Sequence, residues 1–90
     1  MENKRCAETL SITNDFGLHA RVAAKIVALN SRFSSTLILK KGDREVDGSS
    51  ILSILTLSSP KGSNIEVQIT GEDCESFMNE LKKLFRNEFE

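Results

Sequence analysis

Asn64-Ile65-Glu66-Val67-Gln68-Ile69-Thr70 is the clearest structural signal in this chain, because apolar and polar residues alternate along it without interruption. Such alternation is typical of a strand with one face buried and the other in water. Residues 6–13, 36–41 and 45–47 follow the pattern less completely. The sequence therefore predicts four strands, with a hairpin turn at residues 41–44 joining the second to the third.

Apolar residues at helical spacing follow the first and last of these strands. One stripe begins after Ala20 and ends near Ser31, and another begins after residues 71–73. The run at residues 51–57 fits either a helix or a strand by its pattern, but the serines before it are good helix caps and favour a helix. The members of the two stripes are Val22, Ala23, Ile26, Val27, Leu29 and Phe33, and then Phe77, Met78, Leu81, Leu84 and Phe85.

The order of the predicted elements is β-α-β-β-α-β-α, and 90 residues suit one domain over residues 1–90. Alternation on one face of four strands predicts an α+β fold, an open-faced β-sandwich. Its four-stranded antiparallel sheet would have three helices packed on one face. Too few apolar residues remain to cover the other face.

Composition argues against several classes of function. The net charge is −1 and the chain has no Trp or Tyr, which is unlike a nucleic-acid binder. One histidine and two distant cysteines do not form a metal site, and we expect no cofactor. No apolar run follows the N-terminus, so we expect a cytoplasmic protein without membrane insertion. Cys6 and Cys74 are expected to be reduced thiols, with a structural pair as the alternative.

The candidate site is the only histidine, His19, which stands where a helix start normally has Ser, Thr, Asp or Asn. Neutral imidazole is a nucleophile near neutral pH. Backbone N–H groups of Ala20, Arg21 and Val22 would lie at the helix N-terminus, where anions bind. The Arg21 guanidinium would add charge-assisted hydrogen bonds, and small neighbours such as Gly17 leave room for a second protein. These features predict a histidine that accepts a phosphoryl group, although a lone histidine is more often an ordinary surface residue.

Residues 17–24, Gly-Leu-His-Ala-Arg-Val-Ala-Ala, resemble the active-site segment of HPr, the histidine-containing phosphocarrier family of the bacterial sugar phosphotransferase system. Residues 46–57 resemble the second signature of that family, and residues 61–62 its following loop. The resemblance covers nearly the whole chain, and the predicted order of elements is similar to the HPr fold.

The resemblance implies roles for individual residues. His19 would accept phosphate from enzyme I on its δ1 nitrogen and donate it to enzyme IIA domains, and Arg21 would stabilise the phosphate. Ser50 matches a serine that the HPr kinase/phosphorylase modifies in many relatives, but a serine at that place is explained equally well as a helix cap. Partners would dock on Phe16 and on the helix that contains Ile51, Leu52 and Leu55. We expect a monomer.

Within residues 51–57 we expect Leu52 and Leu55 to point outward and Ile54 and Leu57 inward. The chain departs from the family pattern at Val22, where relatives usually have proline, and at Ser49, where many have a basic residue. The sequence does not determine how Val22 affects the rate of phosphate transfer, or whether the kinase recognises Ser50 next to Ser49. The main alternative function is a regulatory adaptor of the same fold. It would act through Ser50 and the apolar helix, without phosphate transfer.

Overall fold

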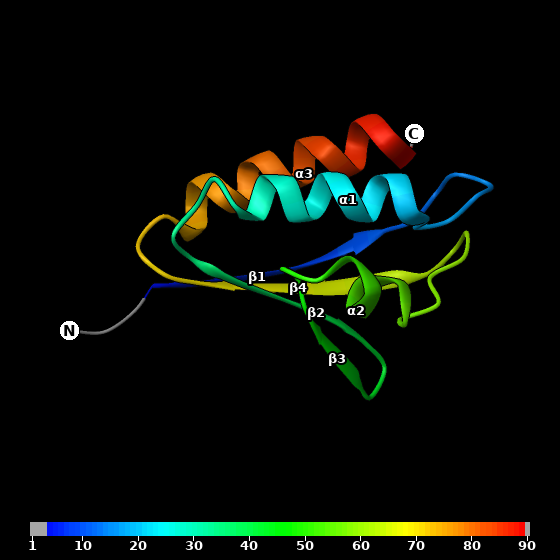
Figure 1. Cartoon of the computed structure of the whole chain (residues 1–90), viewed down its shortest axis with the longest axis horizontal. Helices are drawn as coiled ribbons and strands as arrows, with labels where there is room; N and C mark the ends of the chain where they lie inside the picture. Colours follow the sequence, from blue (N-terminus) through cyan, green and yellow to red (C-terminus); the bar gives the residue numbers. More distant parts are fainter. Residues whose placement is uncertain (1–3, 90) are drawn as a thin grey trace.

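The computed structural model describes residues 4–89, which form four strands and three helices in the predicted order (Figure 1). The strands are β1 (Arg5–Ser11), β2 (Thr36–Lys41), β3 (Arg44–Asp47) and β4 (Asn64–Thr70). The helices are α1 (Ala20–Asn30), α2 (Ile51–Leu55) and α3 (Cys74–Phe89).

The strands form one antiparallel sheet in the order β1-β4-β2-β3, and β4 is paired on both sides. The strand with the most regular alternation is therefore a central strand. Its Ile65, Val67 and Ile69 have no exposed surface, whereas the residues between them are half-buried. The strong alternation of β4 thus reflects one fully covered face.

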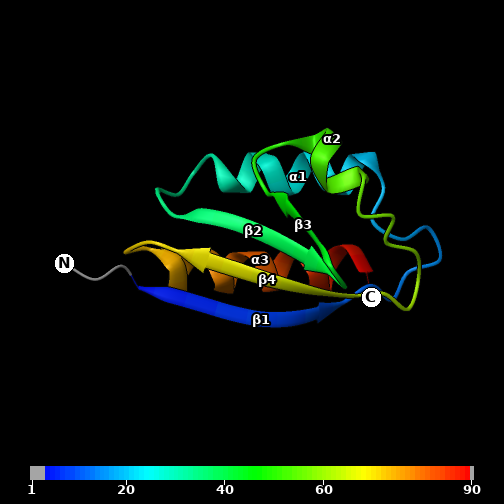
Figure 2. The ribbon, with the colours of Figure 1, turned by 90° about the horizontal axis from the view of Figure 1, so that it is seen from below.

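Helices α1 and α3 run antiparallel to each other over the same face of the sheet (Figures 1 and 2). Helix α2 lies beside α1 and β3. The predicted fold, an open four-stranded antiparallel sheet with three helices, is confirmed. Apolar side chains of α1 and α3 meet those of β2 and β4 in one core, and the rings of Phe33 and Phe77 stack there with centroids 4.7 Å apart.

The element boundaries differ from the prediction by a few residues, most clearly at the end of β1 and at the end of α2. Strand β1 ends at Ser11 rather than at residue 13, because the backbone of Ile12 bonds to the loop before β4 instead of continuing the ladder. Its N–H donates to the Ser63 carbonyl at 2.9 Å, and its own carbonyl accepts from Gly62 at 2.8 Å. Helix α2 ends at Leu55, with Thr56 as its C-cap, although the apolar run continues to Leu57.

The segment that leads into α1 is held against the segment that leads into β4. Gly17 has φ +67°, and a Cβ there would lie 2.5 Å from the carbonyl oxygen of Ser59. Leu18 N–H donates to that same oxygen at 2.9 Å. Only glycine combines this left-handed backbone with so close an approach, so the segment before His19 has a defined path. No helix within residues 4–89 has both the length and the apolar character needed to cross a membrane.

Candidate functional site

His19 is the N-cap residue of α1, with extended backbone angles of φ −99° and ψ 178°. Its carbonyl oxygen accepts the Ala23 N–H at 2.9 Å, which is the first bond of the helix. Its side chain makes no capping hydrogen bond. The imidazole therefore occupies the cap position but does not accept a hydrogen bond from the amides of α1.

The amides of Ala20, Arg21 and Val22 are the first three of α1 and precede its first intrahelical bond. Within residues 4–89 none of them has a protein partner. The first turn of α1 also contains no acidic residue that would offset the helix dipole. Three donors and a partial positive charge at one helix end suit an anion that is attached to the neighbouring histidine.

Phe16, His19 and Arg21 line an open hollow of about 400 Å³ at the start of α1. The rings of Phe16 and His19 meet edge to face, with centroids 6.3 Å apart. Phe16 is 85% exposed and His19 is half-buried. The imidazole is thus supported on one side by an aromatic ring and remains open to solvent, so a second protein can reach it.

Arg21 forms an ion pair with Glu88, near the end of α3. Its Nη1 donates to Glu88 Oε1 at 2.7 Å, and Lys25 Nζ donates to the same oxygen at 3.0 Å. Hydrogen bonding from Lys25 and the charge of Arg21 hold the pKa of the Glu88 carboxyl below its usual value. Two cations therefore share one anion, which leaves a net positive charge on the cluster of Arg21, Lys25 and Glu88.

The Arg21 side chain is 60% exposed and the Glu88 side chain 11%. Because Arg21 is largely exposed, its ion pair with Glu88 is only weakly stabilising, and Lys25 bonds to the same carboxylate oxygen. No local sequence pattern predicts this contact, because Glu88 lies 67 positions from Arg21 in the chain. The predicted phosphate ligand is therefore at the site but bonded to a carboxylate.

Val22 is completely buried in the core. Its side chain thus fills space under α1, while its amide is one of the three free donors described above. An amide at this position is available only because the residue is not proline.

Ser50 is the N-cap of α2, and its hydroxyl oxygen accepts the Ser53 N–H at 3.2 Å. Leu52 is 77% exposed and Ile51 38%, whereas Ile54 and Leu57 are buried. The predicted outward direction of Leu52 and the inward direction of Ile54 and Leu57 are confirmed. Leu55 differs from the prediction, because it is half-buried against the core and not directed outward.

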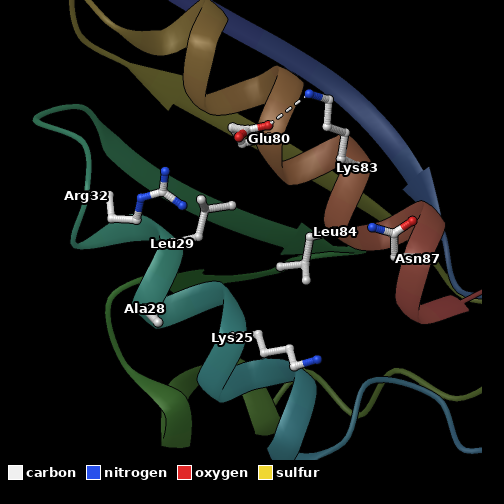
Figure 3. A pocket seen from close by; sticks show the side chains of 8 residues that line it. All are labelled: Lys25, Ala28, Leu29, Arg32, Glu80, Lys83, Leu84 and Asn87. Carbon is white, nitrogen blue, oxygen red and sulfur yellow. Dashed lines mark ion pairs between the residues drawn. The ribbon is translucent and has the colours of Figure 1, made fainter.

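A second hollow, of about 430 Å³, lies between α1 and α3 (Figure 3). Two of its cations already have carboxylate partners, since Lys25 bonds to Glu88 and Lys83 lies 3.3 Å from Glu80. His19 is not among its lining residues, so this larger hollow lies apart from the candidate chemistry. Its lining residues are Lys25, Ala28, Leu29, Arg32, Glu80, Lys83, Leu84 and Asn87. Within residues 4–89 no three His, Cys, Asp or Glu side chains gather as a metal site would require.

Comparison with known proteins gives a consistent result. Residues 6–87 match the family model described as "PTS HPr component phosphorylation site". The phosphocarrier protein HPr of Xylella fastidiosa strain Temecula1 is 42% identical over 80 residues, which are 89% of this chain and 90% of that protein. The phosphocarrier protein NPr of Escherichia coli K12 is 34% identical over 84 residues, 92% of this chain and 93% of that protein. The crystal structure of HPr from Thermoanaerobacter tengcongensis superposes with a TM-score of 0.87 at 33% identity, covering 93% of this chain and 94% of that one.

Proposed function

Because the chain belongs to the HPr family of the bacterial phosphotransferase system, we propose that His19 accepts a phosphoryl group from phospho-enzyme I and passes it to enzyme IIA domains. The observation that supports this most directly is the start of α1. There, His19 holds the cap position without capping, beside three unpaired amides. The carrier is a covalent intermediate in the relay and acts on no free small molecule.

In the proposed step, the lone pair of neutral His19 Nδ1 attacks the phosphorus of the phosphohistidine on enzyme I. A new N–P bond forms as the N–P bond of the donor breaks. The amides of Ala20, Arg21 and Val22 and the Arg21 guanidinium offset the added charge, which is close to two units at neutral pH. Transfer to enzyme IIA is the same displacement with His19 as the leaving group.

We propose that Phe16, Ile51 and Leu52 form the docking face, with Leu55 supporting it from below. Phe16 and Leu52 are both large, apolar and mostly exposed, so both could supply contact area to a partner. This face serves a carrier and a regulatory adaptor equally well. Phosphorylation of Ser50 by an HPr kinase/phosphorylase stays a prediction of the resemblance. A single domain over residues 1–90, a monomer and a cytoplasmic location also stay predictions.

Radiolabelled phosphoenolpyruvate with a matched enzyme I tests the proposal. We expect label on the wild-type chain, in a bond that is labile in acid and stable in base, and none on His19→Ala. Leu52→Ser should accept label more slowly, because it removes apolar contact area but leaves the imidazole and its amides in place. Absence of label on the wild type would favour the adaptor. Label that persists in His19→Ala would show that another residue is the acceptor.

A further inference from the structure

Two cysteine side chains are in contact where α3 begins. The start of α3 and the start of α1 lie at opposite ends of the molecule (Figure 1). Cys6 belongs to β1 and Cys74 is the first residue of α3. Their Sγ atoms lie 2.9 Å apart although 68 positions separate the residues in the chain. No atom fits between the two thiols, and neither contributes to the phosphate site.

The backbone holds both cysteines in place. Cys6 is paired with Ile69 in the ladder between β1 and β4. The Gly71 N–H donates to the Lys4 carbonyl at 2.8 Å, and the Cys74 N–H donates to the Gly71 carbonyl at 3.2 Å. Both thiols are therefore presented by ordered segments, with their sulfur atoms already in contact.

Access to the two thiols is unequal. Cys74 is 1% exposed, whereas Cys6 is half-buried and reachable from solvent. A reagent would therefore meet Cys6 first, and Cys74 would be the inner thiol that resolves the adduct. An accessible thiol with a resolving thiol in contact is the arrangement that thiol–disulfide exchange requires.

The surroundings also make the pair slow to react. The hydrogen bond with Cys74, burial, and the negative charges of Glu75 and Glu8 together raise the pKa of Cys6 to about 11. Because the thiolate is the nucleophile, only a small fraction of Cys6 is reactive at neutral pH. The same two carboxylates disfavour anionic reagents, so a neutral disulfide is the appropriate probe.

We propose that Cys6 and Cys74 form a reversible disulfide site that is oxidised by small disulfides. The Cys6 thiolate attacks one sulfur of the reagent RSSR, which gives a mixed disulfide and one RS⁻. The Cys74 thiolate then attacks the sulfur of Cys6, which closes the protein disulfide and releases a second RS⁻. The protein loses two electrons and two protons, and RSSR takes them up as two RSH.

The bond would join β1 to the start of α3 and close a loop of most of the chain. Cross-links over long loops stabilise chiefly by restricting the unfolded chain, so we expect the melting temperature to rise by about 10 °C or more. His19 precedes α1 and contacts neither cysteine, so the disulfide should not change the rate at which His19 is phosphorylated.

The test treats the folded full chain with bis(2-hydroxyethyl) disulfide at mildly alkaline pH. The wild type should lose both thiols, become lighter by two hydrogens, melt at a higher temperature and revert with dithiothreitol. Cys74→Ala retains the accessible thiol without its partner and should keep the mercaptoethanol adduct. Cys6→Ala retains only the shielded thiol and should react far more slowly.

Three results would overturn the proposal. In the first, the wild type keeps the mercaptoethanol adduct and forms no internal disulfide. In the second, the disulfide forms between two chains. In the third, both thiols of the folded chain stay free although the denatured chain is oxidised. A disulfide that formed without raising the melting temperature would refute the stabilising role, because strain in the folded chain would then offset the restriction of the unfolded chain.

Discussion

At the scale of single residues, the proposed transfer would place two anions, the Glu88 carboxylate and a phosphoryl group on His19, in competition for the Arg21 guanidinium. Arg21 bonds to Glu88 in the unphosphorylated chain, and Lys25 bonds to the same carboxylate oxygen. In the proposed transfer, a phosphoryl group on His19 would offer Arg21 a more highly charged partner than the Glu88 carboxylate. Glu88 retains Lys25 in either state, so the exchange leaves no charge without a partner.

Replacement of Arg21 should therefore slow transfer without unfolding the chain. Loss of a charge-assisted hydrogen bond to the phosphoryl group predicts a rate lower by about 10- to 100-fold for Arg21→Ala. Arg21→Lys keeps the charge but loses the paired donors of the guanidinium, so its transfer rate should lie between those of the wild type and Arg21→Ala. Rapid-quench measurement of phosphate acceptance, with circular dichroism to verify folding, checks this order. A wild-type rate for Arg21→Ala would exclude the guanidinium from the site.

Glu88→Gln is the converse change at the same contact. It removes the anion that holds Arg21, and we expect acceptance to be faster by about two- to fivefold, since an exposed pair competes only weakly. Under the same assay, Glu80→Gln alters a carboxylate on the same helix that does not touch Arg21 and serves as the control. Slower transfer in Glu88→Gln than in this control would mean that Glu88 positions Arg21 rather than competing for it.

At the scale of elements, the start of α1 depends on the segment before it. Gly17 is placed against Ser59 and Pro60, and its left-handed backbone directs the chain into the cap position. The ion pair between Lys61 and Asp15, at 2.9 Å, joins the same two loops from the solvent side. The direction of His19 is therefore set by a loop–loop contact and not by α1 alone.

Gly17→Ala should destabilise the fold and slow phosphate acceptance together. Gly42 is a matched control, because its φ of +60° is similar to that of Gly17 while a Cβ there would meet nothing within 4 Å. We expect a loss of unfolding free energy of about 1 kcal/mol for Gly42→Ala and about 2–4 kcal/mol for Gly17→Ala. Urea denaturation and the labelling assay measure the two effects. Equal losses in the two variants would show that the contact with Ser59 is not limiting.

At the scale of the whole molecule, Asp73 connects the segment after α1 to the start of α3. Its carboxylate accepts the backbone N–H of Ser34 at 2.8 Å and of Ser35 at 3.0 Å, and both hydroxyls also donate to it. The hydrogen bond from the Ser35 hydroxyl, followed by that from the Ser34 amide, lowers the pKa of Asp73 below its usual value. This one side chain therefore fastens two segments that are far apart in sequence.

The lowered pKa of Asp73 predicts that acid reduces the stability of the fold. Since the pKa of Asp73 is lower in the folded than in the unfolded chain, its stabilisation is complete above the unfolded value, near pH 4, and is lost as the pH falls through the folded value. We expect Asp73→Asn to melt at a lower temperature than the wild type at pH 7. Its melting temperature should also decline less below about pH 4. Thermal unfolding across this range checks both, with Asp43→Asn in the exposed hairpin turn as control. An equal fall in melting temperature below about pH 4 in the wild type and in Asp73→Asn would contradict this role of Asp73.

Local patterns in the sequence were sufficient for the type and order of the elements and for the place of His19. Alternation along residues 64–70, helical spacing after Ala20 and a serine before residues 51–55 each report interactions within a few positions. The position of His19 at a helix start follows from the same short-range evidence. These features depend on residues only a few positions away in the chain, so they can be predicted without the tertiary structure.

Only the tertiary structure determined the rest of the site. The pairing of Arg21 with Glu88 requires α1 and α3 to run antiparallel, and the contact of Cys6 with Cys74 requires β1 to lie under the start of α3. The half-buried state of Leu55 depends on what packs against α2 and not on its own periodicity. Such contacts join residues distant in sequence through the packing of one core, and a linear pattern contains no information about which distant side chain that packing brings near.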